Sequence, residues 1–178
     1  LVLFFLTLPM GWVSSSPVFS ALTESVADVT NKYAATSWSP PPHRQDSAAD
    51  TPTPGTRPQS RPGPPPRIRH RRKGPLSHTD VYVDDFVQLI QGGPRRRRRI
   101  RRILFHCIDW VFRAPDEADD EWKKDPISLK KLLKGDGALE TVKVVLGWLI
   151  DTVAGTIELP PRRAARLLEI LSEFPRSR

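Results

Sequence analysis

A long proline-rich stretch limits how this chain can fold. Residues 36–79 hold eleven of the chain's 19 prolines and carry eight Lys or Arg residues against two Asp. Such a segment has too little apolar surface to offset the entropy cost of ordering it. We therefore expect a disordered, basic insertion within one discontinuous fold rather than two domains. The segments expected on this basis are 1–35, 36–79, 80–126 and 127–178.

The charge of the chain favours a polyanionic partner. The net charge is +8 and the isoelectric point is near 10.1, which points first to nucleic acid and second to an anionic membrane surface. A single cysteine, Cys107, cannot form an internal disulfide, so we expect a reducing, intracellular location. The apolar start "LVLFFLTL" lacks a basic flank and is too short to span a bilayer, so no membrane partner is expected. A secreted basic protein is an alternative.

Outside the insertion the residue pattern predicts an α+β fold. Residues 1–8 are continuously apolar and predict a short buried strand, followed by a helix that begins near Ser15 or Ser16. The runs "VYV" and "FVQLI" predict the strands of a hairpin. A further helix should begin at Pro94, and its apolar face would carry Ile100, Ile103, Leu104, Cys107, Ile108 and Val111.

The C-terminal part predicts shorter elements. Residues 116–126 form an acidic loop, and "SLKKLL" predicts a short helical patch. The run "TVKVVLGWLI" is typical of β-structure, and "DTVAG" turns the chain so that "TIEL" can pair with it. An amphipathic helix is expected after Pro160 and Pro161.

Two adjacent aspartates, Asp84 and Asp85, interrupt the expected hairpin. Successive side chains of a straight strand point to opposite faces, so the two carboxylates can act together only at a bend. At a bend they repel each other unless a cation lies between them. Mg²⁺ or Mn²⁺ would remove this conflict, because a hard cation takes one or two protein carboxylates together with water and phosphate oxygens. A solvated surface turn is the alternative interpretation.

Several blocks of the sequence, in the same order, resemble reverse transcriptases of LTR-type and related retrotransposons. "YVDD" at 82–85 is similar to the Tyr-x-Asp-Asp box, and "LPMGW" with "SPVF" resembles the segment that leads into a palm helix. "KVVLGWLIDT" resembles the primer-grip hairpin, and "IELPPRRAARLLEIL" resembles the start of the thumb. The resemblance implies a partial polymerase palm, an antiparallel sheet with helices on one face, followed by the primer grip and the thumb.

The resemblance also implies the activity and its residues. The complete enzyme would be an RNA-directed DNA polymerase that binds an RNA or DNA template–primer and dNTPs and uses a two-metal mechanism. Asp84 and Asp85 would be the catalytic, metal-binding carboxylates. The nucleotide- and primer-binding residues would be Tyr82, Pro9, Met10, Gly11, Gly147 and Trp148.

One member of the expected catalytic site has no match in the sequence. The family carries a further metal-binding aspartate upstream of the Leu-Pro-x-Gly segment, and this chain begins after that position. We therefore expect the chain to be inactive alone. A non-catalytic, basic remnant that binds nucleic acid is the alternative function.

A run of arginines, "PRRRRRIRR" at 94–102, starts the second expected helix. The helix dipole disfavours cations there, so their presence favours contact with phosphate groups. A nuclear-localisation-like patch or a solvated face is the competing interpretation. The residues expected to contact the nucleic-acid backbone are Arg95, Arg96, Arg98, Arg99 and Arg102.

Overall fold

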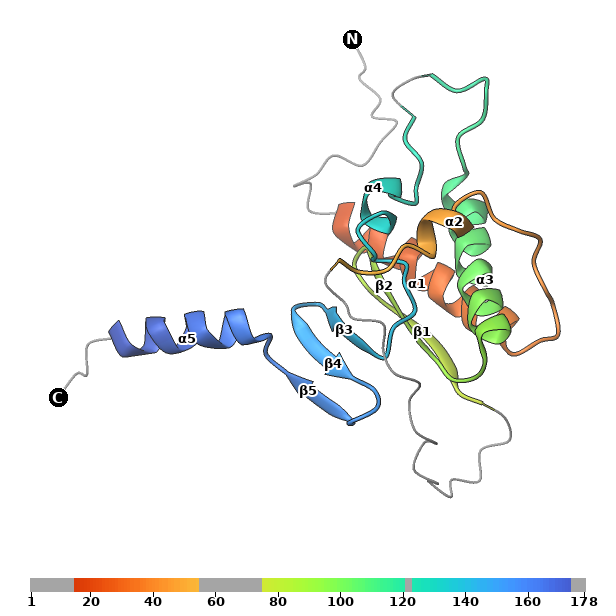
Figure 1. Ribbon diagram of the computed structural model, residues 1–178. Helices are drawn as coiled ribbons and strands as arrows, with labels where there is room; N and C mark the ends of the chain where they lie inside the picture. The colour runs from red at the N-terminus through yellow and green to blue at the C-terminus, as the bar shows by residue number, and fades with distance from the viewer. Residues whose placement is uncertain (1–14, 55–74, 121–122, 174–178) are drawn as a thin grey trace, which may run out of the picture. The chain divides into compact units, whose positions relative to one another are not determined.

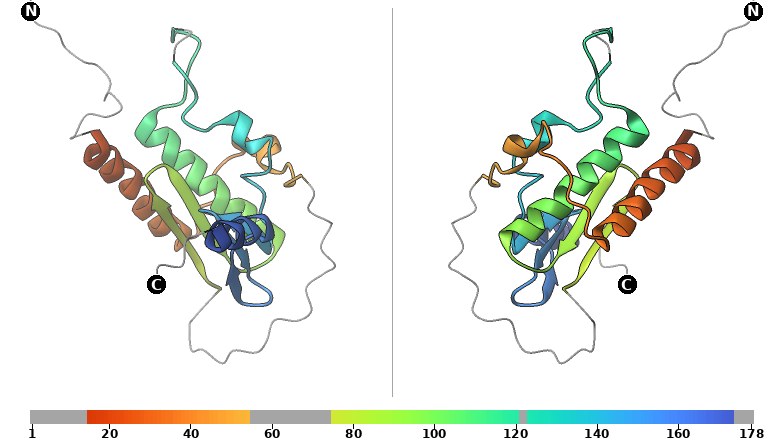
Figure 2. Two further views of the ribbon diagram at one scale, coloured as in Figure 1. Left: turned by 90° about the vertical axis from the view of Figure 1, so that its left-hand side faces the viewer. Right: turned by 90° about the vertical axis from the view of Figure 1, so that its right-hand side faces the viewer.

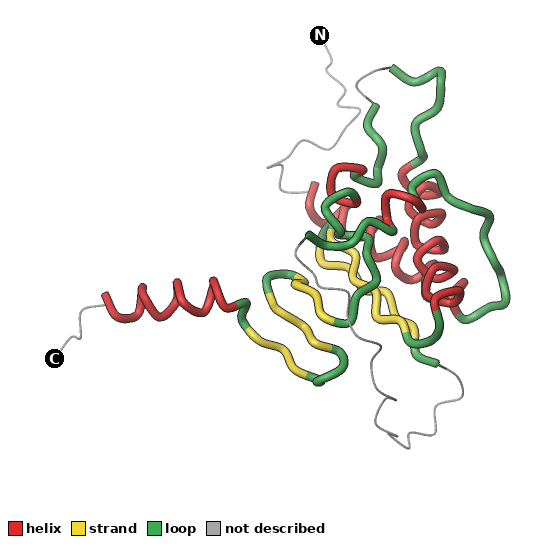
Figure 3. The backbone as a smooth tube through the Cα atoms, viewed as in Figure 1, coloured by secondary structure: helices red, strands yellow, loops and turns green. Residues whose placement is uncertain are grey.

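The computed structural model describes residues 15–54, 75–120 and 123–173. The strand expected at 1–8 and the residues Pro9, Met10 and Gly11 lie outside the described residues. The described chain has a mixed α+β fold with five helices and two small antiparallel sheets (Figure 3). It divides into two compact units, the first ending at Ala138 and the second beginning at Leu139.

The first unit is built on a hairpin and two long helices (Figures 1 and 2). Helix α1 spans Ser15–Ala34 and helix α3 spans Pro94–Phe112. Strands β1 (Ser77–Tyr82) and β2 (Asp85–Ile90) pair antiparallel, as expected. Helix α1 contacts β1, α3 contacts β2, and the two helices contact each other, so the helices and the hairpin share one core.

The apolar face of α3 supplies the largest share of that core. Ile100, Ile103, Leu104, Cys107 and Ile108 are all buried, as the spacing predicted, whereas Val111 is 38% exposed. Val26 of α1, Ala49, Ile127 and Leu132 complete the cluster around them. Each fully buried aliphatic side chain contributes about 1.5–3 kcal/mol, so this helix face dominates the stability of the unit.

The inner face of α1 is partly polar. Thr23 and Thr30 are 1% and 0% exposed, and the Thr30 hydroxyl donates to the carbonyl of Val26 at 2.7 Å. The side chain of Asn31 binds one residue of β1 from both sides: its Nδ2 donates to the Thr79 carbonyl and its Oδ1 accepts from the Thr79 N–H, each at 2.8 Å. The Asn31 side chain therefore pairs the N–H and carbonyl of Thr79 that point away from β2, just as the backbone of a neighbouring strand would.

Residues 36–54 are ordered and packed on α3, so the expectation of a disordered insertion from residue 36 was wrong for this part. The segment crosses α3 and contains the short helix α2 (Asp46–Ala49), whose Ala49 is fully buried. Residues 77–79 likewise belong to β1. Residues 55–74 of the expected insertion lie outside the described residues.

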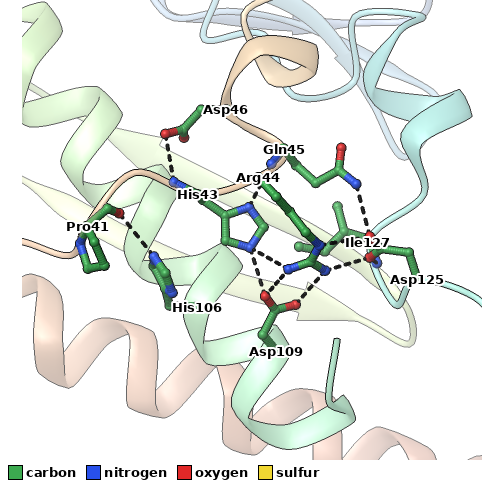
Figure 4. A network of polar contacts seen from close by, with 9 residues as sticks. All are labelled: Pro41, His43, Arg44, Gln45, Asp46, His106, Asp109, Asp125 and Ile127. Carbon is green, nitrogen blue, oxygen red and sulfur yellow. Dashed lines mark hydrogen bonds and ion pairs between the residues drawn. The ribbon is translucent and has the colours of Figure 1, made fainter. Parts of the chain in front are cut away.

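A charged network fastens the 36–54 segment (Figure 4). The Nε2 atom of His43 lies 2.8 Å from Asp109 Oδ2, and His43 Nδ1 accepts from the N–H of Gln45 at 3.0 Å. The guanidinium of Arg44 binds both Asp109 and Asp125, each through a 2.9 Å contact from Nη2 to Oδ1. Charged hydrogen bonds of this kind offset the entropy cost that the composition of the segment suggested would prevent folding.

The first unit ends later than the segment boundary expected at residue 127. Helix α4 (Leu129–Leu132) follows the acidic loop, and both Ile127 and Leu132 join the core of the first unit. The described polypeptide contains no helix that is long and apolar enough to cross a membrane.

The second unit is an antiparallel meander followed by a helix. Strand β4 (Trp148–Asp151) pairs with β3 (Val142–Val145) and with β5 (Thr156–Glu158). The β-rich run at 141–150 is therefore two strands, separated by a turn at Leu146 and Gly147. Helix α5 (Pro161–Glu173) confirms the amphipathic helix expected after the prolines.

The Asn31 contact predicts a specific loss of stability. Asn31→Ala leaves the N–H and carbonyl of Thr79 unpaired, and Thr79 is 2% exposed, so we expect a decrease of about 1–3 kcal/mol in the free energy of unfolding. Urea denaturation followed by circular dichroism measures it. Asn31→Asp keeps the acceptor and should give an intermediate loss; equal stability of Asn31→Ala and the wild type would contradict the role of this contact.

The buried histidine predicts a pH dependence. Burial lowers the pKa of His43 from its usual value, although Asp109 opposes the shift. The ring also faces Arg44 and His106. The unfolded chain takes up a proton near pH 6.5 that the folded chain resists, so the free energy of unfolding should fall as the pH falls below about 6.5.

Denaturation at pH 7.5 and 5.5 tests this dependence. The decrease should be smaller in His43→Gln than in the wild type, whereas His78→Gln, at an exposed position of β1, should keep the wild-type decrease. An NMR titration of the imidazole resonances gives an independent measurement. An unchanged decrease in His43→Gln would show that His43 is not the group that titrates.

Candidate functional site

The two aspartates lie at the tip of the β1–β2 hairpin, but the turn is one residue earlier than expected and Asp85 is the first residue of β2. Tyr82 pairs with Asp85, which leaves Val83 and Asp84 as a two-residue turn. Val83 has a φ of 59°, in the left-handed region that β-branched residues rarely adopt. A positive φ at the first central residue alone is the pattern of a type II′ turn, whose twist matches that of paired strands.

Helix α1 supports this strained turn. The hydroxyl of Thr23 donates to the carbonyl of Val83 at 2.8 Å, two helical turns from the Asn31 contact with β1. A non-glycine residue in this conformation costs about 1–3 kcal/mol and persists only where its surroundings hold it. The chain thus stabilises one particular conformation of the turn that carries Asp84.

The side chains at the tip are open to solvent. Tyr82 is 66% exposed, and the Asp85 side chain is 52% exposed. The Nζ atom of Lys131 lies 3.4 Å from Asp85 Oδ1. Asp84 is exposed beside them. The described residues contain no group of three or more His, Cys, Asp or Glu side chains that could hold a metal ion.

Three of the five arginines expected to contact phosphate are engaged within the fold. Arg96 donates to the carbonyls of Gln91 and Pro75, each at 3.0 Å. Arg99 donates to carbonyls at the end of α1 and in the 36–54 segment, those of Ala34, Thr36 and Trp38. Arg102 pairs with Asp46 at 2.6 Å. These side chains attach other segments to α3.

The remaining two, Arg95 and Arg98, are exposed and make no hydrogen bond or ion pair with the described residues. They stay predicted phosphate contacts. Sequence reasoning missed Arg101, which is 3% exposed and donates to the carbonyls of Ala49 and Gly137 and to Asp50. Its position on the buried face of the expected helix was the available signal.

Gly147 and Trp148 lie at the β3–β4 turn of the second unit. Leu146 and Gly147 have φ values of 48° and 87°, and two positive values in succession are typical of a type I′ hairpin. A Cβ at Gly147 would lie 2.0 Å from Arg163 Nη1, so a larger residue would have to displace this guanidinium and also adopt the positive φ. Trp148, at the start of β4, is 49% exposed.

The His43–Asp109 pair resembles part of a catalytic dyad but serves the fold. The His43 side chain is 2% exposed, and its ring nitrogens contact Asp109, Arg44 and the Gln45 N–H. No Ser or Cys of the described ranges hydrogen-bonds to this ring. Burial alone would raise the pKa of Asp109, but hydrogen bonds from Arg44 and His43 hold it below its usual value. An ionised Asp109 keeps the Arg44 attachment in place.

The exposed hairpin tip is therefore the candidate site, because it joins a strained backbone to two carboxylates and an aromatic side chain. Comparisons of the chain with protein-family models, with curated proteins and with solved structures found no significant match.

Proposed function

We propose that the first unit belongs to the palm of an RNA-directed DNA polymerase of the retrotransposon type, and that the second unit contains its primer grip and the start of its thumb. One observation carries the proposal: the strained hairpin tip presents Asp84 and Asp85 to solvent beside Tyr82. A strained backbone conformation next to two exposed like charges is typical of a functional site.

The residues at the tip fit a divalent cation in part. The donors are carboxylate oxygens, which Mg²⁺ and Mn²⁺ prefer, and two of them with water molecules suffice to hold one ion. Bound Mg²⁺ would supply charge stabilisation at the α-phosphate while a primer 3′-hydroxyl attacks it. Asp84 and Asp85 would orient the nucleotide phosphates through that ion. Lys131, which now neutralises part of the Asp85 charge, would exchange this contact for one with phosphate.

The outer edge of β2 supports the addition of a further strand. Because Tyr82 and Asp85 flank the two-residue turn, Phe86, Gln88 and Ile90 direct their backbone groups away from β1. No hydrogen bond joins these groups to the rest of the described chain. An unpaired strand edge is a template for another strand, and a strand added there would bring its side chains next to Asp85. The upstream aspartate that the resemblance implies would then complete the site.

The other predicted residues would contact the substrates. Tyr82 offers an exposed aromatic face beside the carboxylates, suited to the sugar or base of the primer end. Trp148 and the backbone of Gly147, at their own hairpin tip, would contact the primer strand. Arg95 and Arg98 would contact backbone phosphates in a sequence-independent, salt-sensitive way.

A non-catalytic nucleic-acid-binding remnant is the second candidate. It is favoured by the net charge of +8 and by the absence of a third carboxylate near Asp84 and Asp85 among the described residues. Such a chain would bind template–primer with a steep salt dependence and would not extend it.

A metal-binding measurement tests whether the hairpin tip is a metal site or an ordinary surface turn. We expect Asp85→Asn to weaken Mn²⁺ binding by about tenfold or more, measured by the electron paramagnetic resonance signal of free Mn²⁺, because it removes one of two anionic ligands. Asp80→Asn, an exposed change on the same hairpin, is the matched control and should bind as the wild type does. Equal binding by all three chains would refute a metal site at the tip.

Primer extension then separates the two candidate functions. The reaction is measured with Mg²⁺, a template–primer and labelled dNTPs, using the chain alone and the chain extended at its N-terminus by a strand that carries an aspartate. The polymerase proposal expects extension by the longer chain and its loss in Asp85→Asn. Binding without extension in both chains would favour the remnant.

A further inference from the structure

A cluster of aromatic rings lies on the first unit where α1, α3 and the 36–54 segment meet. Tyr33, Trp38 and Trp110 contact one another, with ring centroids 5.0 Å apart for Tyr33 and Trp38 and 5.5 Å apart for each ring with Trp110. The three residues come from α1, from the 36–54 segment and from α3. Their contacts are independent of the hairpin tip and of any role proposed for it.

The cluster is only partly covered. Trp110 is 54% exposed, and Tyr33 and Trp38 are half-buried. Trp110 packs at a tilt of 35° against Trp38 and edge-on, at 66°, against Tyr33. Two rings therefore fix the orientation of the Trp110 indole while more than half of its surface stays open. A large aromatic side chain that is both held and exposed is suited to stacking a flat ligand.

Two basic residues adjoin the ring cluster, Lys32 in the sequence and Arg99 by contact. Lys32 precedes Tyr33 in the last turn of α1 and is exposed, and Arg99 donates to the Trp38 carbonyl. The nearest carboxylate in the sequence, Asp109, is already bound by His43 and Arg44. Arg95 and Arg98 add unpaired cations farther along α3. Exposed aromatic rings on a unit that also carries free cations favour a polyanionic ligand with flat bases.

We propose that Tyr33, Trp38 and Trp110 form a stacking platform for the unpaired bases of single-stranded nucleic acid. Stacking of a base on an exposed aromatic ring contributes affinity without sequence preference, since every base presents a π-face, and flanking cations bind the phosphates. The platform is a second nucleic-acid surface, separate from Asp84 and Asp85. It therefore stands or falls independently of the polymerase proposal.

Two probes with equal phosphate charge isolate the stacking contribution. The first is fluorescein-labelled oligo(dT) of twelve nucleotides, and the second is the abasic strand of the same length. Fluorescence anisotropy with the full chain at fixed salt should show that Trp110→Leu binds oligo(dT) about tenfold more weakly than the wild type. The same variant should bind the abasic strand as the wild type does.

Two further variants control for packing. Trp110→Phe keeps an aromatic face and should retain affinity for oligo(dT) within about threefold. Val111→Ala changes the neighbouring half-exposed residue, which is 38% exposed and outside the ring cluster, and should have no effect. Circular dichroism confirms that each variant is folded before binding is compared.

Three results would overturn the inference. The first is unchanged oligo(dT) binding by Trp110→Leu, and the second is an equal loss for the abasic strand. The third is a wild-type dimer in sedimentation velocity that Trp110→Leu converts to a monomer, which would show that a second copy of the chain covers the rings.

Discussion

Four arginines of α3 attach the neighbouring segments of the first unit to this helix. Arg96 binds the entry to β1, Arg99 binds the end of α1, and Arg101 and Arg102 bind the region of α2. The same helix supplies half of the buried apolar residues in the described part of the chain. Helix α3 therefore holds its neighbours both by apolar packing and by arginine hydrogen bonds, and these bonds add to the stability that a small core provides. Guanidinium groups suit this task, since each offers five donors in a rigid plane to the carbonyls around it.

The hairpin tip depends on α3 indirectly, through helix α1. Helix α3 and the 36–54 segment hold α1, and α1 holds the hairpin through Thr23 and Asn31. The positive φ of Val83 is tolerated because both the strands and the α1 hydroxyl define the turn. A carboxylate pair on a mobile loop would lose conformational entropy on binding a cation. On this hairpin much of that cost is met during folding.

The sequence predicted a helix or strand well where the apolar residues follow one clear spacing, or where a single proline or turn marks the boundary of the element. The apolar spacing from Ile100 to Ile108 and the start of α3 at Pro94 were confirmed. The hairpin also forms, with its turn at Val83 and Asp84, one residue earlier than expected. Buried polar side chains could not be predicted this way. Thr23 and Thr30 bury methyl groups only because their hydroxyls find carbonyl acceptors, and the ordering of residues 36–54 depends on carboxylates at 109 and 125, distant in sequence from Arg44. Composition counts charges but does not reveal which of them meet.

Residues on both sides of the 55–74 segment are anchored on the first unit, so the protein could be divided within that segment. Thr53 donates to the carbonyl of Gly135 at 3.4 Å, and Pro75 accepts from Arg96. The contacts of α1 with α3 and with β1 are all made by residues outside this link, although the link makes their association intramolecular. A chain cut between residues 54 and 75 therefore has the means to reassemble from two fragments. The break suits fragment complementation, with the N-terminal piece carrying α1 and the C-terminal piece carrying the hairpin that α1 supports.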